Sequence, residues 1–228
     1  MPSPELTQDP RREVKIVVSH LTPHQLRHVI WMNKAGFLQI HHRRRINNIY
    51  LDTQDFRHYY ENVNGLPKRT KPRIRWYGKT TGAIRKPVLE LKAKDNLWGT
   101  KQRFPLEPTD RGPSFFNDPL ACCGKGLPGG LERHSAVMGN SYVREYYLSR
   151  DGRYRLTLDT EVDYFEVHRQ GGPRFSPELR DPPCRLVIEI KCDREHEAGL
   201  PSIVSTFPFR VTRNSKYVNG VRRIHGKG

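Results

Sequence analysis

Alternating charged and apolar residues recur along the chain, at the period of two that is typical of β-strands. In the run Arg73-Ile74-Arg75-Trp76-Tyr77 the two arginines share one face of a strand, about 6–7 Å apart. Because neighbouring guanidinium groups repel each other, this face predicts an anionic group opposite them. Four further segments carry charged residues at the same spacing: Glu13/Lys15, Glu90/Lys92, Arg153/Arg155 and Glu189/Lys191.

These charged faces can point to solvent or to a shared interior. A strand in a sandwich hides its apolar face and shows its polar face to water. In a closed barrel of about eight strands the interior is wide enough for one ligand, and apolar faces can pack outward against helices. The residues between the charges in Leu89-Glu90-Leu91-Lys92 and Val187-Ile188-Glu189-Ile190-Lys191 are strongly apolar. From the pattern alone, a charged bore and an exposed charged face both stay open.

The rest of the pattern predicts many strands and few helices. Thr22 or Ser19 can cap a helix that has Pro23 at its first position and stops at Gly36. Strands are predicted at residues 13–18, 37–40, 46–53, 69–77, 86–93, 101–106, 141–148, 154–159, 162–168 and 185–192. Short helical segments are predicted at 56–62, 116–122 and 195–204, a basic turn at 41–45, and long connections at 107–130 and 170–183.

Antiparallel strands joined by hairpins dominate this arrangement. The predicted fold class is therefore α+β and mostly β, namely a closed antiparallel β-barrel with a few peripheral helices, because closure removes unpaired edges. At 228 residues the chain is long enough for one core. We expect a flexible leader at residues 1–11 and a single domain at residues 12–228.

Charge narrows the class of partner. Forty Lys and Arg residues against 24 Asp and Glu give a formal charge of +16, which favours an anionic partner: nucleic acid, an acidic membrane surface or phosphate-rich molecules. No apolar run of about 18 residues could span a membrane, and the first residues resemble no secretory signal. The four cysteines fit no zinc spacing, so we expect reduced cysteines in a cytoplasmic protein.

The residue types of the charged strands suit phosphate chemistry. Arg and Lys can bind successive phosphates of a chain, and carboxylates among them can hold Mg²⁺ or Mn²⁺, which bridges to phosphate oxygens. Phosphoryl transfer then depends on positioning and charge neutralisation more than on a covalent nucleophile. The sequence contains neither a GxxxxGK[ST] loop nor a GxGxxG motif, and no Ser/His/Asp or Cys/His arrangement is evident.

Eight short motifs, in order, connect these segments to a known family. The chain resembles the VTC domain, the catalytic domain of vacuolar-transporter-chaperone polyphosphate polymerases, within the CYTH or triphosphate tunnel metalloenzyme superfamily. The motifs are Glu13-Val14-Lys15, Asn48-Ile49-Tyr50-Leu51-Asp52-Thr53, Arg73-Ile74-Arg75-Trp76-Tyr77-Gly78, Leu89-Glu90-Leu91-Lys92, Tyr142-Val143-Arg144, Arg155-Leu156-Thr157-Leu158-Asp159-Thr160, Ile188-Glu189-Ile190-Lys191 and Ser215-Lys216-Tyr217.

The resemblance implies an eight-stranded antiparallel tunnel that transfers the γ-phosphoryl group of ATP to a growing polyphosphate chain, with Mn²⁺ or Mg²⁺. By motif position it implies Glu189 as the metal ligand. It implies catalytic phosphate-binding roles for Lys15, Arg73, Arg75, Lys92, Arg144, Arg155 and Lys216. Further substrate contacts are expected from Lys101, Arg103, Tyr142, Lys191, Arg213 and Ser215.

The chain departs from the family pattern at its N-terminal motif. Many members of the superfamily carry ExExK, whereas this chain has Arg11 where the first Glu would fall, so metal binding depends heavily on Glu189. Residues 107–130 do not align with the helix that such domains usually place there. No regulatory domain or membrane segment is evident, so any membrane association would come through a partner protein.

Two other functions stay open. A tunnel triphosphatase would hydrolyse inorganic triphosphate or nucleoside triphosphates, but it would need more carboxylates than this chain supplies. A non-catalytic domain could bind polyphosphate or nucleic acid, although Trp31, Trp76 and Trp98 form no series for specific nucleic-acid binding.

Several residues also have two interpretations. Trp76 and Tyr77 could stack on adenine, but core or rim packing is favoured. Glu90 could hold a second metal or, preferably, an arginine, and Asp159 could cap the bore or pair with an arginine. Arg43-Arg44-Arg45 could attract polyphosphate, but a solvated turn is favoured.

Overall fold

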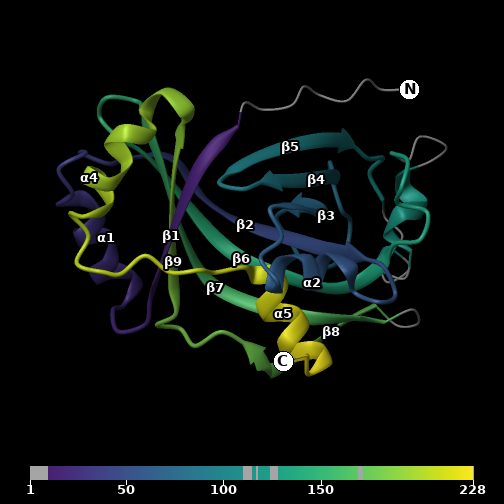
Figure 1. The fold of residues 1–228 in the computed structure, drawn as a ribbon. Helices are drawn as coiled ribbons and strands as arrows, with labels where there is room; N and C mark the ends of the chain where they lie inside the picture. The colour runs from purple at the N-terminus through teal and green to yellow at the C-terminus, as the bar shows by residue number, and fades with distance from the viewer. Residues whose placement is uncertain (1–9, 110–114, 117, 124–127, 169–171, 228) are drawn as a thin grey trace.

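The computed structural model describes residues 10–109, 115–116, 118–123, 128–168 and 172–227. Within these residues, nine strands form one antiparallel sheet in the order β6-β2-β3-β4-β5-β1-β9-β7-β8. The additional pairing of β6 with β7 closes eight of them into a ring, and β8 extends from β7 outside it (Figure 1). The mostly antiparallel β fold expected from the sequence is therefore confirmed.

The strands are β1 (Arg11–Val18), β2 (Leu38–Asp52), β3 (Lys68–Tyr77), β4 (Val88–Asp95), β5 (Trp98–Pro105), β6 (Ser135–Leu148), β7 (Tyr154–His168), β8 (Gly172–Arg180) and β9 (Leu186–Asp193). The helical segments are α1 (Pro23–Trp31), α2 (Arg57–Val63), η1 (Pro119–Cys123), η2 (Arg194–Gly199), α4 (Leu200–Val204) and α5 (Lys216–His225). Among the described residues, no helix has the length and apolar character that spanning a membrane requires.

The apolar faces of most ring strands pack away from the interior. Ile16, Ile188 and Leu158 belong to one buried cluster together with Leu26 and Ile30 of α1. On the other side, residues of β2, β3 and β4 form a second cluster with aromatic residues of the connection after β5: Ile49, Ile74, Trp76, Leu89, Phe115 and Phe116. Burial on the outer face therefore leaves the inner face free for polar side chains.

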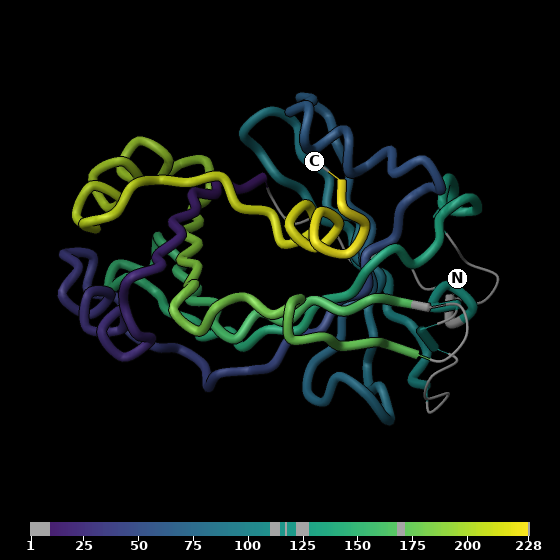
Figure 2. Tube along the Cα trace, turned by 90° about the horizontal axis from the view of Figure 1, so that it is seen from below, coloured from purple at the N-terminus to yellow at the C-terminus, as the bar shows by residue number. Residues whose placement is uncertain are grey.

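The C-terminal segment before α5 lies along β1, beyond the short pairing of β1 with β5. These strands pair only at Arg11 with Gly99 and at Arg12 with Trp98. Farther along β1, the hydrogen-bond partner of the strand is Thr212. Its backbone N–H donates to the Lys15 carbonyl at 2.8 Å, and its hydroxyl accepts from the Val17 N–H at 2.9 Å. Figure 2 shows this segment running from α4 to α5.

A buried carboxylate fixes α5 and α2 to the ring. Asp52, at the end of β2, accepts hydrogen bonds from the backbone N–H groups of His58 at 2.9 Å and Tyr59 at 3.0 Å. It also accepts a hydrogen bond from the Tyr217 hydroxyl of α5. The Tyr217 ring stacks on Tyr50, with 5.0 Å between the ring centroids. These contacts hold the first turn of α5, and thus Lys216, at the interior of the ring.

The predicted first helix is confirmed at its start and ends earlier than expected. Thr22 caps α1, and the Gln25 side chain accepts a hydrogen bond from the Thr22 N–H at 2.8 Å, which completes a capping box. The helix ends at Trp31 and not at Gly36. In the long connection 107–130, the described part contains the predicted helical turn as η1.

Three predictions of local structure were wrong. Residues 41–45 are not a turn but part of β2, where register shifts beside His41 let the strand bend without ending. The two strands predicted at 154–168 are one strand, β7, with Glu161 in the left-handed region at φ 51°. The predicted loop 170–183 contains β8, which accommodates prolines because it pairs only with β7.

The predicted leader, residues 1–11, falls largely outside the described residues, although Arg11 already belongs to β1.

Trp76 is a core residue: its side chain is 1% exposed, and its ring lies 5.6 Å from that of Phe115. Adenine stacking is therefore wrong for Trp76.

Close packing at Gly139 gives a prediction about stability. Gly139 on β6 lies opposite Phe165 on β7, and a Cβ atom added there would overlap the fully buried Phe165 ring. We expect Gly139→Ala to lower the free energy of unfolding by about 1–3 kcal/mol, because the ring must move. Chemical denaturation measures the change. Gly129→Ala is the control, since its Cβ would meet nothing within 4 Å; equal stability of the two variants would contradict the prediction.

Candidate active site

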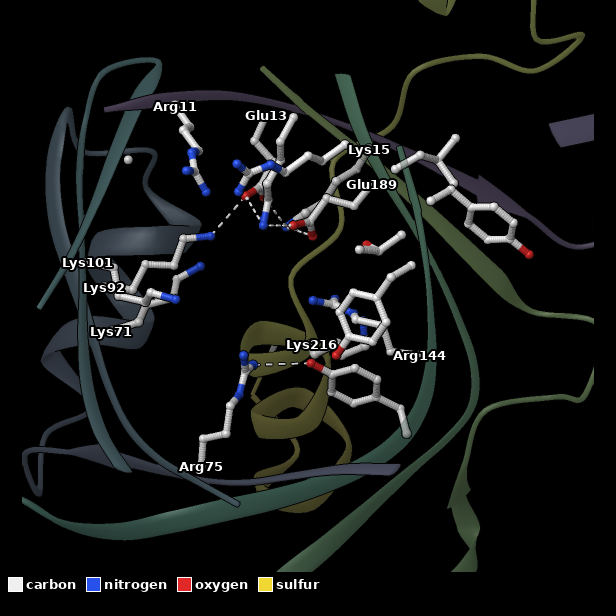
Figure 3. A pocket seen from close by; sticks show the side chains of 18 of the residues that line it. Arg11, Glu13, Lys15, Lys71, Arg75, Lys92, Lys101, Arg144, Glu189 and Lys216 are labelled. Carbon is white, nitrogen blue, oxygen red and sulfur yellow. Dashed lines mark hydrogen bonds and ion pairs between the residues drawn. The ribbon is translucent and has the colours of Figure 1, made fainter. Parts of the chain in front are cut away.

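Inward-facing side chains of the ring line a cavity of about 670 Å³ (Figure 3). Among the described residues, the lining contains thirteen Lys and Arg side chains but only two carboxylates, Glu13 and Glu189. The cations are Arg11, Lys15, Arg44, Lys71, Arg73, Arg75, Lys92, Lys94, Lys101, Arg144, Arg155, Lys191 and Lys216. They come from all eight ring strands and from α5, so the charges of separate strands converge on one space.

Glu90 holds four of the cations near the cavity. Its carboxylate accepts two hydrogen bonds from Arg73, at 2.9 and 2.7 Å, and lies 3.5–3.7 Å from nitrogens of Arg75, Lys101 and Arg103. Glu90 is 1% exposed. Burial alone would raise the pKa of this carboxyl, but Arg75, Arg73 and Lys101 outweigh it and hold the pKa well below its usual range. Glu90 is therefore an arginine partner, the role that the sequence favoured.

Two carboxylates on neighbouring strands share a set of lysines. Glu13 on β1 lies 2.8 Å from Lys15, 3.0 Å from Lys92 and 3.6 Å from Lys191. Glu189 on β9 lies 3.7 Å from Lys15 and forms an ion pair with Lys191. Burial raises the pKa of both carboxyls, yet the lysines more than compensate and lower it. Both groups are therefore carboxylates at neutral pH.

Asp159 and Tyr142 position a third group of cations. Asp159 is fully buried and accepts hydrogen bonds from Arg144 at 2.6 and 2.7 Å and from Lys216. The Lys216 ammonium lies 4.4 Å from the centre of the Tyr142 ring, and the Tyr142 hydroxyl accepts a hydrogen bond from Arg75 at 3.2 Å. Of the two interpretations of Asp159, the structure supports the one in which Asp159 pairs with an arginine.

Some cavity lysines lack a full complement of negative charge. Lys71 donates a hydrogen bond to the Ser215 hydroxyl at 3.1 Å but lies within 4 Å of no carboxylate of the described residues. Burial, followed by Lys15 and Lys92, lowers the pKa of Lys71 well below its ordinary value. Burial and nearby arginines outweigh Glu90 and lower the pKa of Lys101 to about 8.

The pKa of Lys92 is lowered in the same way as those of Lys71 and Lys101. Glu13 raises the pKa of Lys92, but burial together with Lys191 and Lys15 outweighs this effect and lowers the pKa to about 8. The carboxylates of the cavity therefore do not fully offset the burial and mutual repulsion of these lysines.

The ring brings most of the predicted site residues together. Twelve line the cavity: Lys15, Arg73, Arg75, Lys92, Lys101, Tyr142, Arg144, Arg155, Glu189, Lys191, Ser215 and Lys216. Arg155 is exposed and so lies at the opening. Arg103 does not line the cavity but reaches Glu90. Arg213 is exposed and away from the cavity, because its neighbour Thr212 is the residue that bonds to β1.

Sequence reasoning missed several lining residues. Arg11, Lys71 and Lys94 each stand two positions from a charged residue that was identified, on the same strand face. Extending the alternation by one step would have found them. Arg44 also lines the cavity, although a solvated turn had been favoured for it. Its position could not be read from the sequence, since the bulges around His41 change which residues face inward.

The donor set fits a divalent cation only together with a phosphate ligand. No group of three or more His, Cys, Asp or Glu side chains comes together around a metal-sized space in the described parts of the chain. Glu13 and Glu189 supply two ionised carboxylates that face the cavity. Mg²⁺ commonly uses one or two carboxylates, with phosphate oxygens and water completing its shell. Glu189, with Glu13, would hold such an ion.

Comparisons with known proteins agree with this geometry. No curated protein matches the sequence. A putative adenylyl cyclase from Hippeastrum with a dominant triphosphatase activity shares the fold, with a TM-score of 0.51 and 18% identity over 96% of each chain. A putative adenylate cyclase from Bacillus halodurans gives a TM-score of 0.57 and 16% identity over 96% of this chain and 98% of that one.

The profile of a protein family also matches most of the chain. It is described as the VTC domain, and it matches residues 10–112 and 132–225. The match includes every strand of the ring, and the structural neighbours share the ring fold. The chain therefore belongs to the VTC domain family.

Proposed function

We propose that this domain transfers the γ-phosphoryl group of ATP to the end of a growing polyphosphate chain. The observation that carries the proposal is the charge of the cavity, with thirteen Lys and Arg side chains against two carboxylates in its described lining. A linear polyphosphate carries negative charge on every phosphate, so it neutralises such a surface along its whole length. Membership of the VTC domain family supports the same substrate class.

The cavity residues would act by binding and orienting two phosphate chains. Arg75 donates to the Tyr142 hydroxyl and Arg144 lies over the Tyr142 ring, so both lie at the cavity wall and can donate to the oxygens of the transferred group. A terminal oxygen of polyphosphate attacks the γ-phosphorus, the bond from this phosphorus to the bridging oxygen breaks, and its electron pair leaves with ADP. The nucleophile is already an anion, so no general base is required. A bound Mn²⁺ or Mg²⁺ would neutralise charge on the triphosphate.

Triphosphate hydrolysis is the second candidate, supported by the dominant triphosphatase activity of the Hippeastrum neighbour. Hydrolysis needs a group that orients water. Each of Glu13, Glu90, Asp159 and Glu189 is engaged by at least two cations of the described residues. Glu90 and Asp159 hold cations and do not line the cavity, whereas Glu13 and Glu189 would hold the metal ion. Among the described residues no further carboxylate faces the cavity to orient water, which favours transfer to a phosphate chain.

The products of ATP turnover test this proposal. We expect the purified domain, incubated with ATP and Mn²⁺ or Mg²⁺, to form ADP and polyphosphate, with little orthophosphate. Gel electrophoresis resolves the polymer and a colorimetric assay measures orthophosphate. ADP and orthophosphate without polymer would identify a triphosphatase. Binding of ATP without either product would indicate a domain that only binds polyanions.

Glu189→Gln tests the metal ligand. It keeps the shape of the side chain and removes its charge, so we expect the rate to fall about 10- to 100-fold and to recover in part at higher Mn²⁺ concentration. Glu195→Gln is the matched control, because Glu195 is exposed on η2. A Glu189→Gln variant with an unchanged rate and metal dependence would contradict this assignment.

Lys71 separates binding from stability. Its buried ammonium has no carboxylate partner among the described residues, so replacing it with an apolar side chain removes a desolvation cost. We expect Lys71→Met to raise the thermal midpoint and to weaken tripolyphosphate binding about 10- to 100-fold, as calorimetry measures. Lys68→Met, at an exposed position of β3, is the control. A lower midpoint together with unchanged affinity would show that Lys71 is purely structural.

The pH dependence of binding follows from Lys101. Its pKa is about 8 in the unliganded protein, so it is charged below this pH and neutral above it. Bound phosphate favours the charged form, and the tripolyphosphate dissociation constant should therefore rise about tenfold between pH 7 and pH 9. Lys101→Arg keeps its charge and should reduce this rise, although Lys92, whose pKa is also about 8, still contributes to it. A wild-type affinity independent of pH in this range would contradict the prediction.

A further inference from the structure

Aromatic side chains gather at one opening of the cavity. Tyr77, Tyr146 and His41 all line it, and Tyr77 is 42% exposed although it is a large ring. A side chain that lines a cavity and is also exposed lies at the rim. Tyr146 and His41 pack edge to face, with 5.8 Å between their ring centroids. This rim differs from the rest of the lining, where charged groups dominate.

Arg44 packs against these rings and not against a carboxylate. Its guanidinium carbon lies 5.3 Å from the centre of the Tyr146 ring and 6.0 Å from that of Tyr77. Its Nε atom is buried and has no hydrogen-bond partner among the described residues. Arg44 also forms no ion pair there, in contrast to Arg73 and Arg144. Its contacts with the two rings are cation–π contacts.

This aromatic rim lies next to the groups that would bind phosphate. Tyr77 follows Arg75 by two residues on β3, so both face the same side of the sheet, about 7 Å apart. Arg44 on β2 is paired with Arg144 on β6. A molecule whose phosphates bind Arg75 and Arg144 would therefore extend its other end over Tyr77, Arg44 and Tyr146.

We propose that Tyr77, supported by Arg44 and Tyr146, stacks on the nucleobase of a nucleoside triphosphate donor. The inference rests on the proposed use of ATP as the donor, and it assigns the nucleoside part to this rim. Aromatic rings and guanidinium planes bind the π face of any base, and stacking of this kind tolerates different bases. The site therefore favours nucleoside triphosphates over inorganic triphosphate.

Binding measurements with two probes test the proposal. Calorimetry with ATP and with tripolyphosphate gives the ratio of their dissociation constants. A change of charge in the cavity alters the affinity for both probes, so the ratio reports contacts made by the nucleoside. We expect Tyr77→Ala to weaken ATP binding at least about fivefold and to leave tripolyphosphate binding unchanged. Tyr77→Phe keeps the ring and should keep the ratio of the wild-type protein.

Tyr60→Ala is the matched control. Tyr60 is 43% exposed, as Tyr77 is, but it lies on α2 and does not line the cavity. We expect this variant to bind both probes as the wild-type protein does. Tyr77→Ala removes an exposed side chain, so the fold should persist, and a thermal midpoint close to that of the wild-type protein verifies it.

Equal effects of Tyr77→Ala on ATP and on tripolyphosphate, or no effect on either, would overturn the nucleobase site. This result is distinct from failure of the proposed function. A protein that forms no polymer but loses ATP selectively in Tyr77→Ala would keep the nucleobase site and refute the polymerase. A protein that forms polymer, and in which Tyr77→Ala leaves the ratio of the two dissociation constants unchanged, would support the polymerase and refute the nucleobase site.

Discussion

The cations that face the interior of the ring repel one another, and buried carboxylates offset this repulsion. Glu90 alone lies 2.7–3.7 Å from nitrogens of four Lys and Arg side chains. The carboxylates of Asp159, Glu13 and Glu189 each contact at least two Lys or Arg side chains as well. Removing one carboxylate would leave several buried like charges uncompensated. The carboxylates are therefore part of the framework, and the charge that they do not compensate is available to an anionic substrate.

Two features of the fold make this concentration of charge stable. The apolar residues between the charges, such as Ile74 and Ile188, are fully buried on the outer side of the ring, so hydrophobic packing does not need the interior. The C-terminal segment then joins the ends of the chain at the site, because the Lys15 ammonium donates to the Asn214 carbonyl at 3.1 Å. Burial of this kind strengthens each charge–charge contact and also lowers the pKa of Lys71.

Much of the fold could be predicted from the sequence, because charge alternation marks the strands whichever way they face. The period-two pattern showed that Arg73 and Arg75 share one face of a strand. It did not show whether this face points into the ring, because that depends on closure between strands distant in sequence. The inward direction was an expectation from the family resemblance. β8 escaped prediction because its prolines are typical of loops, and Arg213 because an irregular segment has no fixed period. Arg44 depends on bulges, whose positions follow from tertiary pairing.

A crystal structure of the domain with tripolyphosphate tests the central claim most directly, namely that the enclosed cations bind a linear phosphate chain. The account predicts phosphate oxygens at hydrogen-bond distance, about 2.7–3.2 Å, from Arg75, Arg144 and Lys71 inside the ring. Phosphate bound only on the outer surface, with Glu90 and Asp159 still holding every nearby cation and the cavity free of the anion, would contradict it.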